Sequence, residues 1–274
     1  MSDGLEPPEG RRRARKSLGQ NFLVDPNLQR RIVSTLGAGP DSEVLEIGPG
    51  RGALTRHLAG SVARLILVEL DNDLARHWQE TAEGRADIEV IHRDILDVAV
   101  AELTDAPGEL LVVGNIPYNI TTPILFHLLG RPRPSRIVLM VQKEVGERIV
   151  AEPGSRAYGA LAVGVQSVAD VRLAFGVSRR VFRPVPRVDS VVIEIVPHAP
   201  PRLSERDEID LRTLTRAAFQ WRRKQLQKTL RDHGDLGLGL DRVEALAEAL
   251  GFDLRRRPET FGPGDLLAIA RAIR

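Results

Sequence analysis

Residues 43–53 read EVLEIGPGRGA, and this stretch decides the fold. Its first five residues form a short, mainly apolar run typical of a buried strand, and the glycines precede a helix-like segment, ALTRHLA. Glycines at such a turn let the backbone approach a ligand closely, and the helix N-terminus offers free N–H groups. The same residues satisfy the dinucleotide pattern GxGxxA, so a dehydrogenase stays a candidate at this point.

The chain alternates short apolar runs with helix-like segments as far as residue 142. Runs rich in Val, Ile and Leu that alternate with helical stretches predict a parallel sheet covered on both faces. The expected strands are 43–47, 64–70, 87–94, 109–115 and 136–142. Two later runs, 161–168 and 189–196, predict a terminal hairpin that closes the sheet with an antiparallel strand. The predicted fold class is therefore α/β and doubly wound.

A proline-rich stretch, PHAPP at 197–201, predicts a linker. Helical character follows it at residues 207–232, 241–250 and 263–273. The expected domains are therefore a basic arm at 1–16, an α/β domain at 17–198 and a small helical domain at 202–274.

Composition excludes several classes of function. The 274 residues include no cysteine, which rules out disulfides, thiolate catalysis and cysteine-ligated metal. The six histidines have no spacing typical of a metal site, so no metal is expected. No apolar run approaches the roughly 18 residues of a membrane span, and the N-terminus lacks the apolar core of a signal peptide. We therefore expect a cytoplasmic protein.

Two basic clusters stand near opposite ends of the chain. The first is RRRARK at 11–16, and the second spans 216–231 without an acidic residue. Its six positive charges are Arg216, Arg222, Arg223, Lys224, Lys228 and Arg231. Either cluster alone fits a solvated surface, but the two together favour a polyanionic partner.

Acidic residues stand where the second and third predicted strands end. Glu69 lies 21 residues after Gly48, where a carboxylate can accept hydrogen bonds from both ribose hydroxyls. Asp94, in HRDIL, can accept a hydrogen bond from an exocyclic adenine amine. Either acid could instead cap the helix that follows it. Three successive strand ends carrying Gly, Glu and Asp favour a nucleoside ligand.

The fourth predicted strand ends in GNIPY, residues 114–118. The pattern Asn-x-Pro-Tyr/Phe resembles the catalytic motif of amino-group methyltransferases that use S-adenosylmethionine. Adenine N6 is a weak nucleophile because its lone pair is delocalised into the ring. The Asn115 oxygen and a backbone carbonyl held by Pro117 could accept both of its hydrogens and localise that lone pair, with Tyr118 stacked on the base. The plain alternative is a strand end that Pro117 terminates.

Five longer motifs extend this resemblance over most of the chain. They are KSLGQNFLVD (16–25), LEIGPGRGALT (45–55), VGNIPYNITTPILFHLL (113–129), MVQKEVGERIVAEPGSRAYGALAV (140–163) and FRPVPRVDSVV (182–192). On these motifs the chain resembles the KsgA/Dim1 family of ribosomal RNA adenine dimethyltransferases, and its bacterial branch most of all. The resemblance implies a Rossmann-like class I methyltransferase sheet with a small C-terminal helical RNA-binding domain.

The resemblance also implies roles for single residues. Those implied in binding S-adenosylmethionine are Asn21, Leu23, Gly48, Gly50, Glu69, Asp94 and Asn115. Those implied at the target base are Asn115, Ile116 through its carbonyl, Pro117, Tyr118 and Phe182. Phe182 would sandwich the base with Tyr118, although a Phe before a proline-rich turn is as often part of the core.

The implied reaction is dimethylation of N6 of two adjacent adenosines in a hairpin near the 3′ end of small-subunit rRNA. We expect a monomer that acts on a partly assembled subunit, with phosphate contacts from its basic residues. Those expected to contact RNA are Arg11, Arg12, Arg13, Arg222, Arg223 and Lys224. The tail departs from the family, since FQWRRKQLQKTL lacks an RRKTLRN-like run, and this departure concerns tail contacts rather than catalysis.

Two alternatives stay open beside this hypothesis. An Erm-type large-subunit methyltransferase shares the catalytic motifs, but its members more often carry NIPF and lack a tail like residues 240–274. A non-catalytic RNA-binding assembly factor would share the fold, but EIGPGRG, Glu69, Asp94 and NIPY are all intact.

Overall fold

The structure, a computed structural model, describes residues 20–274. The basic arm predicted for residues 1–16, with Arg11, Arg12 and Arg13, lies outside the described residues. Two compact units make up the described chain. The first runs to Gly146 and includes Val171–Ala199, and the second comprises Glu147–Asp170 and Pro200–Arg274. The predicted boundary near residue 200 thus has a counterpart, but residues 147–170 join the second unit.

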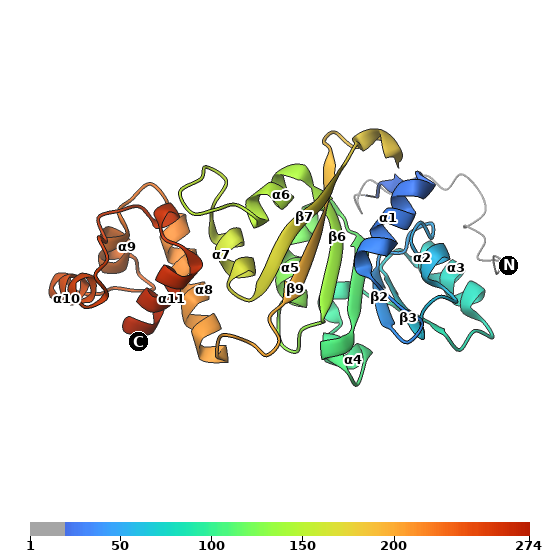
Figure 1. The fold of residues 1–274 in the computed structure, drawn as a ribbon, viewed down its shortest axis with the longest axis horizontal. Helices are drawn as coiled ribbons and strands as arrows, with labels where there is room; N and C mark the ends of the chain where they lie inside the picture. The colour runs from blue at the N-terminus through green and yellow to red at the C-terminus, as the bar shows by residue number, and fades with distance from the viewer. Residues whose placement is uncertain (1–19) are drawn as a thin grey trace. The chain divides into compact units, whose positions relative to one another are not determined.

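A seven-stranded sheet in the order β4-β3-β2-β5-β6-β9-β7 forms the centre of the first unit (Figure 1). The pairs β2·β3, β2·β5, β3·β4 and β5·β6 are parallel, whereas β9 runs antiparallel to β6. A separate ribbon pairs β1 with β8. The strands are β1 Phe22–Leu23, β2 Glu43–Ile47, β3 Arg64–Glu69, β4 Ile88–His92, β5 Leu111–Asn115, β6 Arg136–Gln142, β7 Ala169–Val177, β8 Phe182–Arg183 and β9 Ser190–Pro197. The doubly wound α/β prediction is confirmed.

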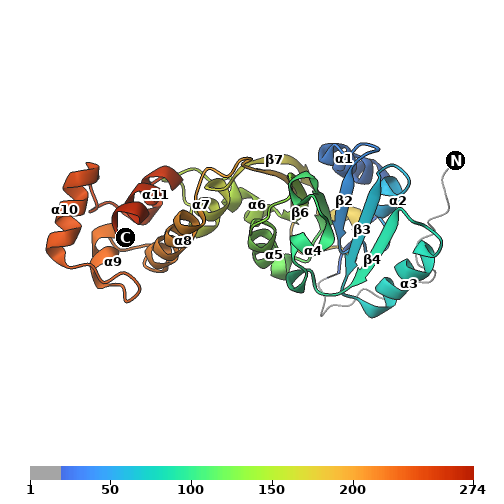
Figure 2. The same cartoon turned by 90° about the horizontal axis from the view of Figure 1, so that it is seen from below.

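Helices cover both faces of this sheet, with α1, α2 and α3 on one face and α5 and α6 on the other (Figures 1 and 2). Asp25 caps the first of them, since its side chain accepts from the N–H groups of Asn27 and Leu28, and Pro26 occupies the first turn. The helices up to β6 and just after it are α1 Pro26–Leu36, α2 Thr55–Leu58, α3 Asn72–Ala82, α4 Val100–Leu103, α5 Thr121–Leu128 and α6 Lys143–Ile149.

The glycine turn after β2 is held by packing as well as by its backbone. Gly52 has a φ of 74°, and a Cβ there would lie 2.6 Å from the ring of buried Trp78. The Trp78 indole N–H in turn donates to the Gly50 carbonyl at 3.0 Å. A residue larger than glycine at position 52 would therefore push α3 away from the turn.

The strand predicted at 161–168 is wrong, because this segment forms helix α7, Ala160–Gln166. Its residues Leu161, Ala162, Val163 and Val165 are all buried, so periodicity could not separate helix from strand. The edge strand is β7 instead, which begins one residue after the predicted run. Only its two end residues, Ala169 and Val177, are buried, so it lacks the apolar run that marks the inner strands.

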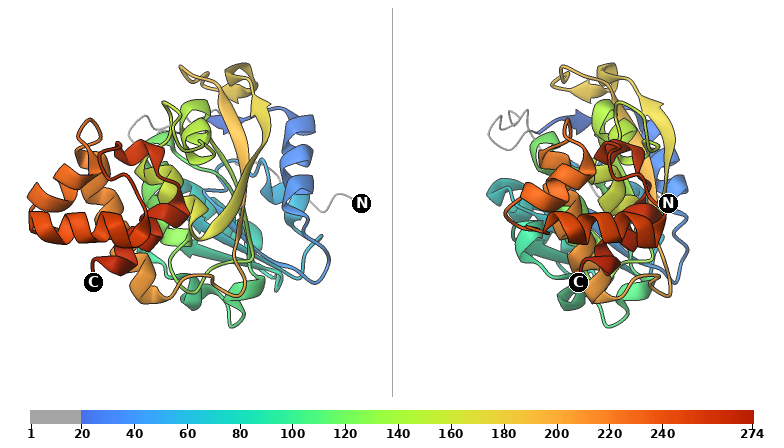
Figure 3. Two further views of the ribbon diagram at one scale, coloured as in Figure 1. Left: turned by 60° about the vertical axis from the view of Figure 1, so that its left-hand side comes forward. Right: turned by 90° about the vertical axis from the view of Figure 1, so that its left-hand side faces the viewer.

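Helices make up the second unit, and the orange to red ones group together in Figure 3. They are α7, α8 Glu205–Gln220, α9 Leu226–Asp232, α10 Leu240–Leu250 and α11 Pro263–Ala272. The single helix predicted at 207–232 is two, because the chain leaves the helix at Trp221 and starts again after Gln225. Arg222, Arg223 and Lys224 therefore lie in a break between helices and not on a helix face.

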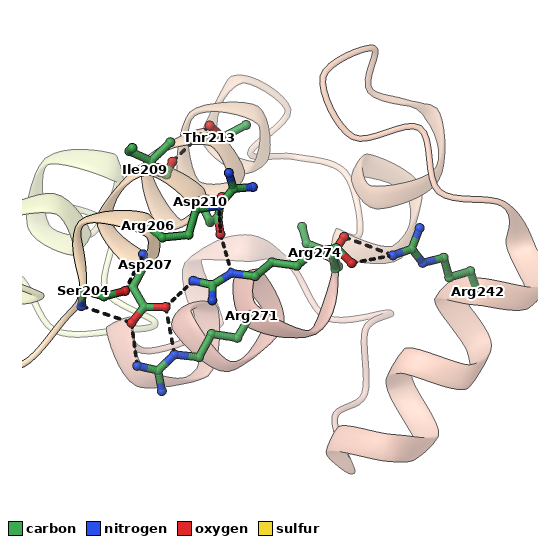
Figure 4. A network of polar contacts seen from close by, with 10 residues as sticks. Ser204, Arg206, Asp207, Ile209, Asp210, Thr213, Arg242, Arg271 and Arg274 are labelled. Atoms are coloured by element: carbon green, nitrogen blue, oxygen red, sulfur yellow. Dashed lines mark hydrogen bonds and ion pairs between the residues drawn. The ribbon is translucent and has the colours of Figure 1, made fainter.

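A carboxylate network joins the two ends of this helical unit (Figure 4). Asp207, in the first turn of α8, accepts two hydrogen bonds from the Arg271 guanidinium at 3.1 and 2.8 Å. Its carboxylate also receives the Ser204 backbone N–H and a guanidinium N–H of Arg274. The Arg271 hydrogen bonds hold the pKa of Asp207 well below its usual range, so this carboxylate is ionised at neutral pH.

Candidate functional site

A cavity of about 570 Å³ opens at the carboxyl ends of β2, β3, β4 and β5. These ends lie side by side because the four strands are parallel and in register, with Ile47 paired to Val68 and to Gly114. In an open α/β sheet this edge is where ligands bind. The predicted residues that line the cavity are Asn21, Leu23, Gly48, Gly50, Glu69, Asp94, Asn115, Ile116, Pro117 and Tyr118.

The glycine loop leaves room on the cavity side. Gly48 has a φ of 63°, and a Cβ built there would meet no heavy atom within 4 Å. Its N–H is bonded to the Val68 carbonyl at 2.9 Å, so the turn is anchored to β3. The backbone at this position is therefore open to close approach by a ligand.

Glu69, at the carboxyl end of β3, is a buried acid, with 6% of its surface exposed. Its two carboxylate oxygens accept separate backbone N–H groups, from Asp71 at 2.9 Å and from Gly50 at 3.1 Å. Burial raises the pKa of Glu69, while these two hydrogen bonds act in the opposite direction. The bonds fix the carboxylate between the glycine loop and α3, with a second lone pair on each oxygen for a ligand.

Asp94 follows β4 and begins a 3₁₀ turn, Ile95–Asp97. One of its oxygens accepts the Leu96 N–H at 3.0 Å, which is the capping role considered from the sequence. The other oxygen makes no hydrogen bond with the described residues, and Asp94 lines the cavity. Capping and ligand binding are therefore compatible at this carboxylate.

Asn115 ends β5 and is held by a segment 94 residues away. Its side-chain Nδ2 donates to the Asn21 carbonyl at 2.9 Å. The next residues, Phe22 and Leu23, pair with Arg183 and Phe182 in the β1·β8 ribbon. Because a carbonyl can only accept, this bond defines the amide orientation and leaves Oδ1 without a partner among the described residues.

Tyr118 lies three residues further on, and its hydroxyl is 2.7 Å from the Ser190 Oγ at the start of β9. Burial raises the pKa of Tyr118, so the phenol stays neutral at physiological pH. Pro117 and Tyr118 use their carbonyls within the turn, accepting from Ile120 and Thr121. The Ile116 carbonyl accepts no hydrogen bond from the described part of the chain.

Phe182 is not brought to the cavity with these residues. Its side chain is fully buried in the core of the first unit, and it is not one of the lining residues. The pairing with Leu23 turns it inward as part of the ribbon that carries Asn21. The structure thus favours the core alternative over a stacking face at this position.

Two findings concern a metal site and a membrane span, neither of which is expected from the sequence. Among residues 20–274, no group of three or more His, Asp or Glu side chains could hold a metal ion. No helix within the same residues is long and apolar enough to cross a membrane.

Comparison with known proteins identifies the family to which this geometry belongs. The model of the family described as ribosomal RNA adenine dimethylase matches residues 11–239. The chain belongs to this family. The chain is 42% identical over 264 residues to "Ribosomal RNA small subunit methyltransferase A" of Geobacter metallireducens, and the match covers 95% of this chain and 96% of the relative.

Solved structures agree with the class I methyltransferase fold of this chain. A dimethyladenosine transferase from Plasmodium falciparum is 25% identical and superposes with a TM-score of 0.77, covering 90% of this chain and 95% of its own. The 23S rRNA methyltransferase ErmE is 27% identical with a TM-score of 0.70, covering 92% and 99%.

Glu46 and Phe22 also line the cavity, and the sequence interpretation missed both. Glu46 is 2% exposed, and its Oε2 has no hydrogen-bond partner among the described residues. Burial raises the pKa of Glu46 to about 8, although Thr55 beside it acts in the opposite direction. The sequence feature that could have pointed to Glu46 is the presence of an acid inside the apolar run EVLEI. Phe22 carries the Arg51 guanidinium over its ring, at 4.4 Å from the centroid.

Glu46→Gln is expected to change how the stability of the protein depends on pH. In the wild type the folded pKa near 8 lies above the unfolded value of about 4.3, so the folded state binds more protons between them. Stability should therefore fall as pH rises from 5 to 8, by on the order of 1 kcal/mol per pH unit from this group. Urea unfolding of the Gln variant should lack this component, and parallel pH profiles for the two proteins would contradict the assignment.

Proposed function

We propose that this protein transfers two methyl groups from S-adenosylmethionine to N6 of each of two adjacent adenosines near the 3′ end of small-subunit rRNA. The observation that carries the proposal is Asn115, whose Nδ2 is anchored while Oδ1 has no partner within residues 20–274 at the cavity. It shares that cavity with the Gly48 turn and the Glu69 carboxylate. A base amine and a nucleoside cofactor would therefore meet at the end of β5.

The residues of the cavity fit S-adenosylmethionine. Glu69 would hold the ribose hydroxyls through its remaining lone pairs, and the free oxygen of Asp94 would accept from the adenine amine. Asn21 and Leu23 would cover the cofactor, and Gly48 and Gly50 would let its methionine end lie against the backbone. The buried Oε2 of Glu46 has no hydrogen-bond partner among the described residues. It could accept a hydrogen bond from a cationic ligand, which would supply the donor that the protein lacks there. When bound, this cofactor supplies an electrophilic methyl group on sulfur.

The protein's own contribution is to hold the target amine. At the end of β5, Asn115 Oδ1 and the Ile116 carbonyl are acceptors without a partner in the described part of the chain, and together they match the two hydrogens of N6. Accepting both would localise the nitrogen lone pair and aim it into the cavity. Pro117 restrains the backbone before it, which keeps that carbonyl in place. The nitrogen would bond to the methyl carbon as the carbon–sulfur bond breaks, and the proton of the resulting cationic amine would leave to solvent, so no strong base is required.

Tyr118 would stack on the target base, and Ser190 would position its ring through the 2.7 Å hydrogen bond. Ser190→Ala and Tyr118→Phe each remove this bond while keeping the ring, so each should lower kcat by about threefold to tenfold. The double variant should be no slower than either single variant, since both changes remove one interaction. Single-turnover methylation measures this, with Ser61→Ala on the surface as control; additive losses would contradict the pairing.

Sequence similarity favours the small subunit over the large one as the source of the RNA substrate. The fold alone does not separate them, because ErmE superposes over 92% of this chain. The relative named for the small subunit is 42% identical, against 27% for ErmE. Arg222, Arg223 and Lys224 in the second unit would add phosphate contacts to a partly assembled subunit.

Methylation of under-methylated small subunits with labelled cofactor tests the proposal. The expected product is N6,N6-dimethyladenosine at two adjacent positions, identified by mass spectrometry of nuclease digests. Large subunits lacking their own adenine methylation serve as the competing substrate. Label in guanine, in cytosine or only in large-subunit rRNA would refute the proposed function.

A further inference from the structure

Trp221 is an exposed aromatic residue in the break between α8 and α9. It has 37% of its surface exposed, whereas Trp78, the only other tryptophan of the chain, is 1% exposed. Its indole meets the His233 ring edge-on, with the ring centroids 5.3 Å apart. His233 is itself held by Gln220 at 2.9 Å. The Trp221 ring thus packs against His233, while another part of its surface is exposed to solvent.

Some cations of the basic cluster around this tryptophan are already engaged by other groups of the protein. Acidic residues from outside 216–231 reach two of its arginines, as Asp235 pairs with Arg216 at 2.8 Å and Asp232 pairs with Arg231. Arg222 is partly engaged, since it donates to the Arg156 carbonyl and lies 3.9 Å from Glu259.

Arg223 and Lys224, by contrast, are both exposed. Neither side chain makes an ion pair or hydrogen bond within residues 20–274. Arg223 and Lys224, which stand within three residues of Trp221, therefore remain for a ligand, as does the exposed Lys228 further along in α9. The backbone of the break keeps them close, because the Lys224 N–H donates to the Trp221 carbonyl at 2.7 Å.

We propose that Trp221 stacks on an unpaired base of the RNA substrate while Arg223 and Lys224 contact the flanking phosphates. An exposed aromatic ring beside unpaired cations is the combination that recognises unpaired nucleotides, since every base offers a π-face and every linkage a negative charge. A purely apolar partner would leave the two cations desolvated and unpaired. The inference rests on the proposed function, because it takes RNA as the ligand of this unit.

Binding of the full-length protein to a small-subunit rRNA fragment tests this site directly. Because Trp78 is buried, a change in tryptophan emission on adding RNA should come from Trp221, and it should disappear in Trp221→Phe if that ring is the reporter. Trp221→Ala should weaken RNA binding about tenfold, as expected for one stacked base. Leu240→Ala, which truncates an apolar residue 53% exposed in the same unit, is the matched control and should bind normally.

Salt dependence separates stacking from charge. Arg223→Gln should reduce the slope of log Kd against log salt by about 0.7 to 0.9, whereas Trp221→Ala should leave that slope unchanged. Unchanged affinity of Trp221→Ala for RNA, or no emission change in the wild type on saturation, would overturn the stacking role. Cofactor titration of each variant is run in parallel, so a protein that binds cofactor but no rRNA would instead count against the proposed function itself.

Discussion

Asn115→Ala should abolish methyl transfer almost completely, lowering the single-turnover rate by on the order of a thousandfold. The variant loses the Oδ1 acceptor, so one N–H of the target amine has no partner and its lone pair stays delocalised into the ring. It also loses the part-buried Nδ2 hydrogen bond to the Asn21 carbonyl, a bond between the end of β5 and the segment before β1. RNA binding should stay within a few-fold of wild type, because phosphate contacts dominate affinity.

Asn115→Asp sharpens this experiment because it keeps the size of the side chain. Its carboxylate cannot donate to the Asn21 carbonyl, and the two oxygens would repel one another. We expect a similar loss of rate, with added loosening of the segment that carries Phe22 and Leu23. Asn27→Ala, in the exposed first turn of α1, is the matched control. Near-normal methylation by Asn115→Ala would contradict the role assigned to its oxygen.

Glu69→Ala should weaken binding of S-adenosylmethionine about a hundredfold. Hydrogen bonds to a buried carboxylate are worth roughly 1.5–3 kcal/mol each, and this variant would lose those to the ribose. It would also leave the N–H groups of Gly50 and Asp71 without acceptors, so the glycine turn itself should loosen. Calorimetric titration with S-adenosylmethionine and with its demethylated product measures the change.

Glu69→Gln separates the ligand contact from the support of the turn. Its amide oxygen can still accept one of the two backbone N–H groups, so we expect a well-folded protein with a loss of affinity of only about tenfold. Glu80→Gln, an exposed acid on α3, should bind as wild type does. Equal affinities for wild type and both Glu69 variants would place the ribose elsewhere.

The local pattern of apolar residues was sufficient to predict most strands of the first unit. The runs that became β2, β3, β5 and β6 are buried on both faces, so each is a short block of Val, Ile and Leu that no exposed element would carry. The same reasoning misread 161–168, because a helix buried all round presents the same run of letters. It also missed the break at Trp221–Gln225, where no proline or glycine interrupts the helical pattern.

Much of the candidate site was predictable because it lies at strand ends. In a parallel sheet, the residues after successive strands must meet at one edge, so Gly48, Glu69, Asp94 and Asn115 could be placed together from their order alone. Phe182 differs, because its position depends on the β1·β8 ribbon, whose pairing spans some 160 residues of chain. No local pattern tells whether such a side chain faces a core or a ligand.

The sequence by itself determined the class of fold, the family and the residues that gather at the carboxyl edge of the sheet, because apolar periodicity and strand order are local properties. Only the tertiary structure decided which atoms are free to act. Within residues 20–274 it engages Asn115 Nδ2 and leaves Oδ1 open, and it buries the Oε2 of Glu46 without a partner. Among the same residues it neutralises part of the basic cluster while Arg223 and Lys224 stay unpaired. Those outcomes depend on partners distant in the chain, and only folding brings them within hydrogen-bond distance.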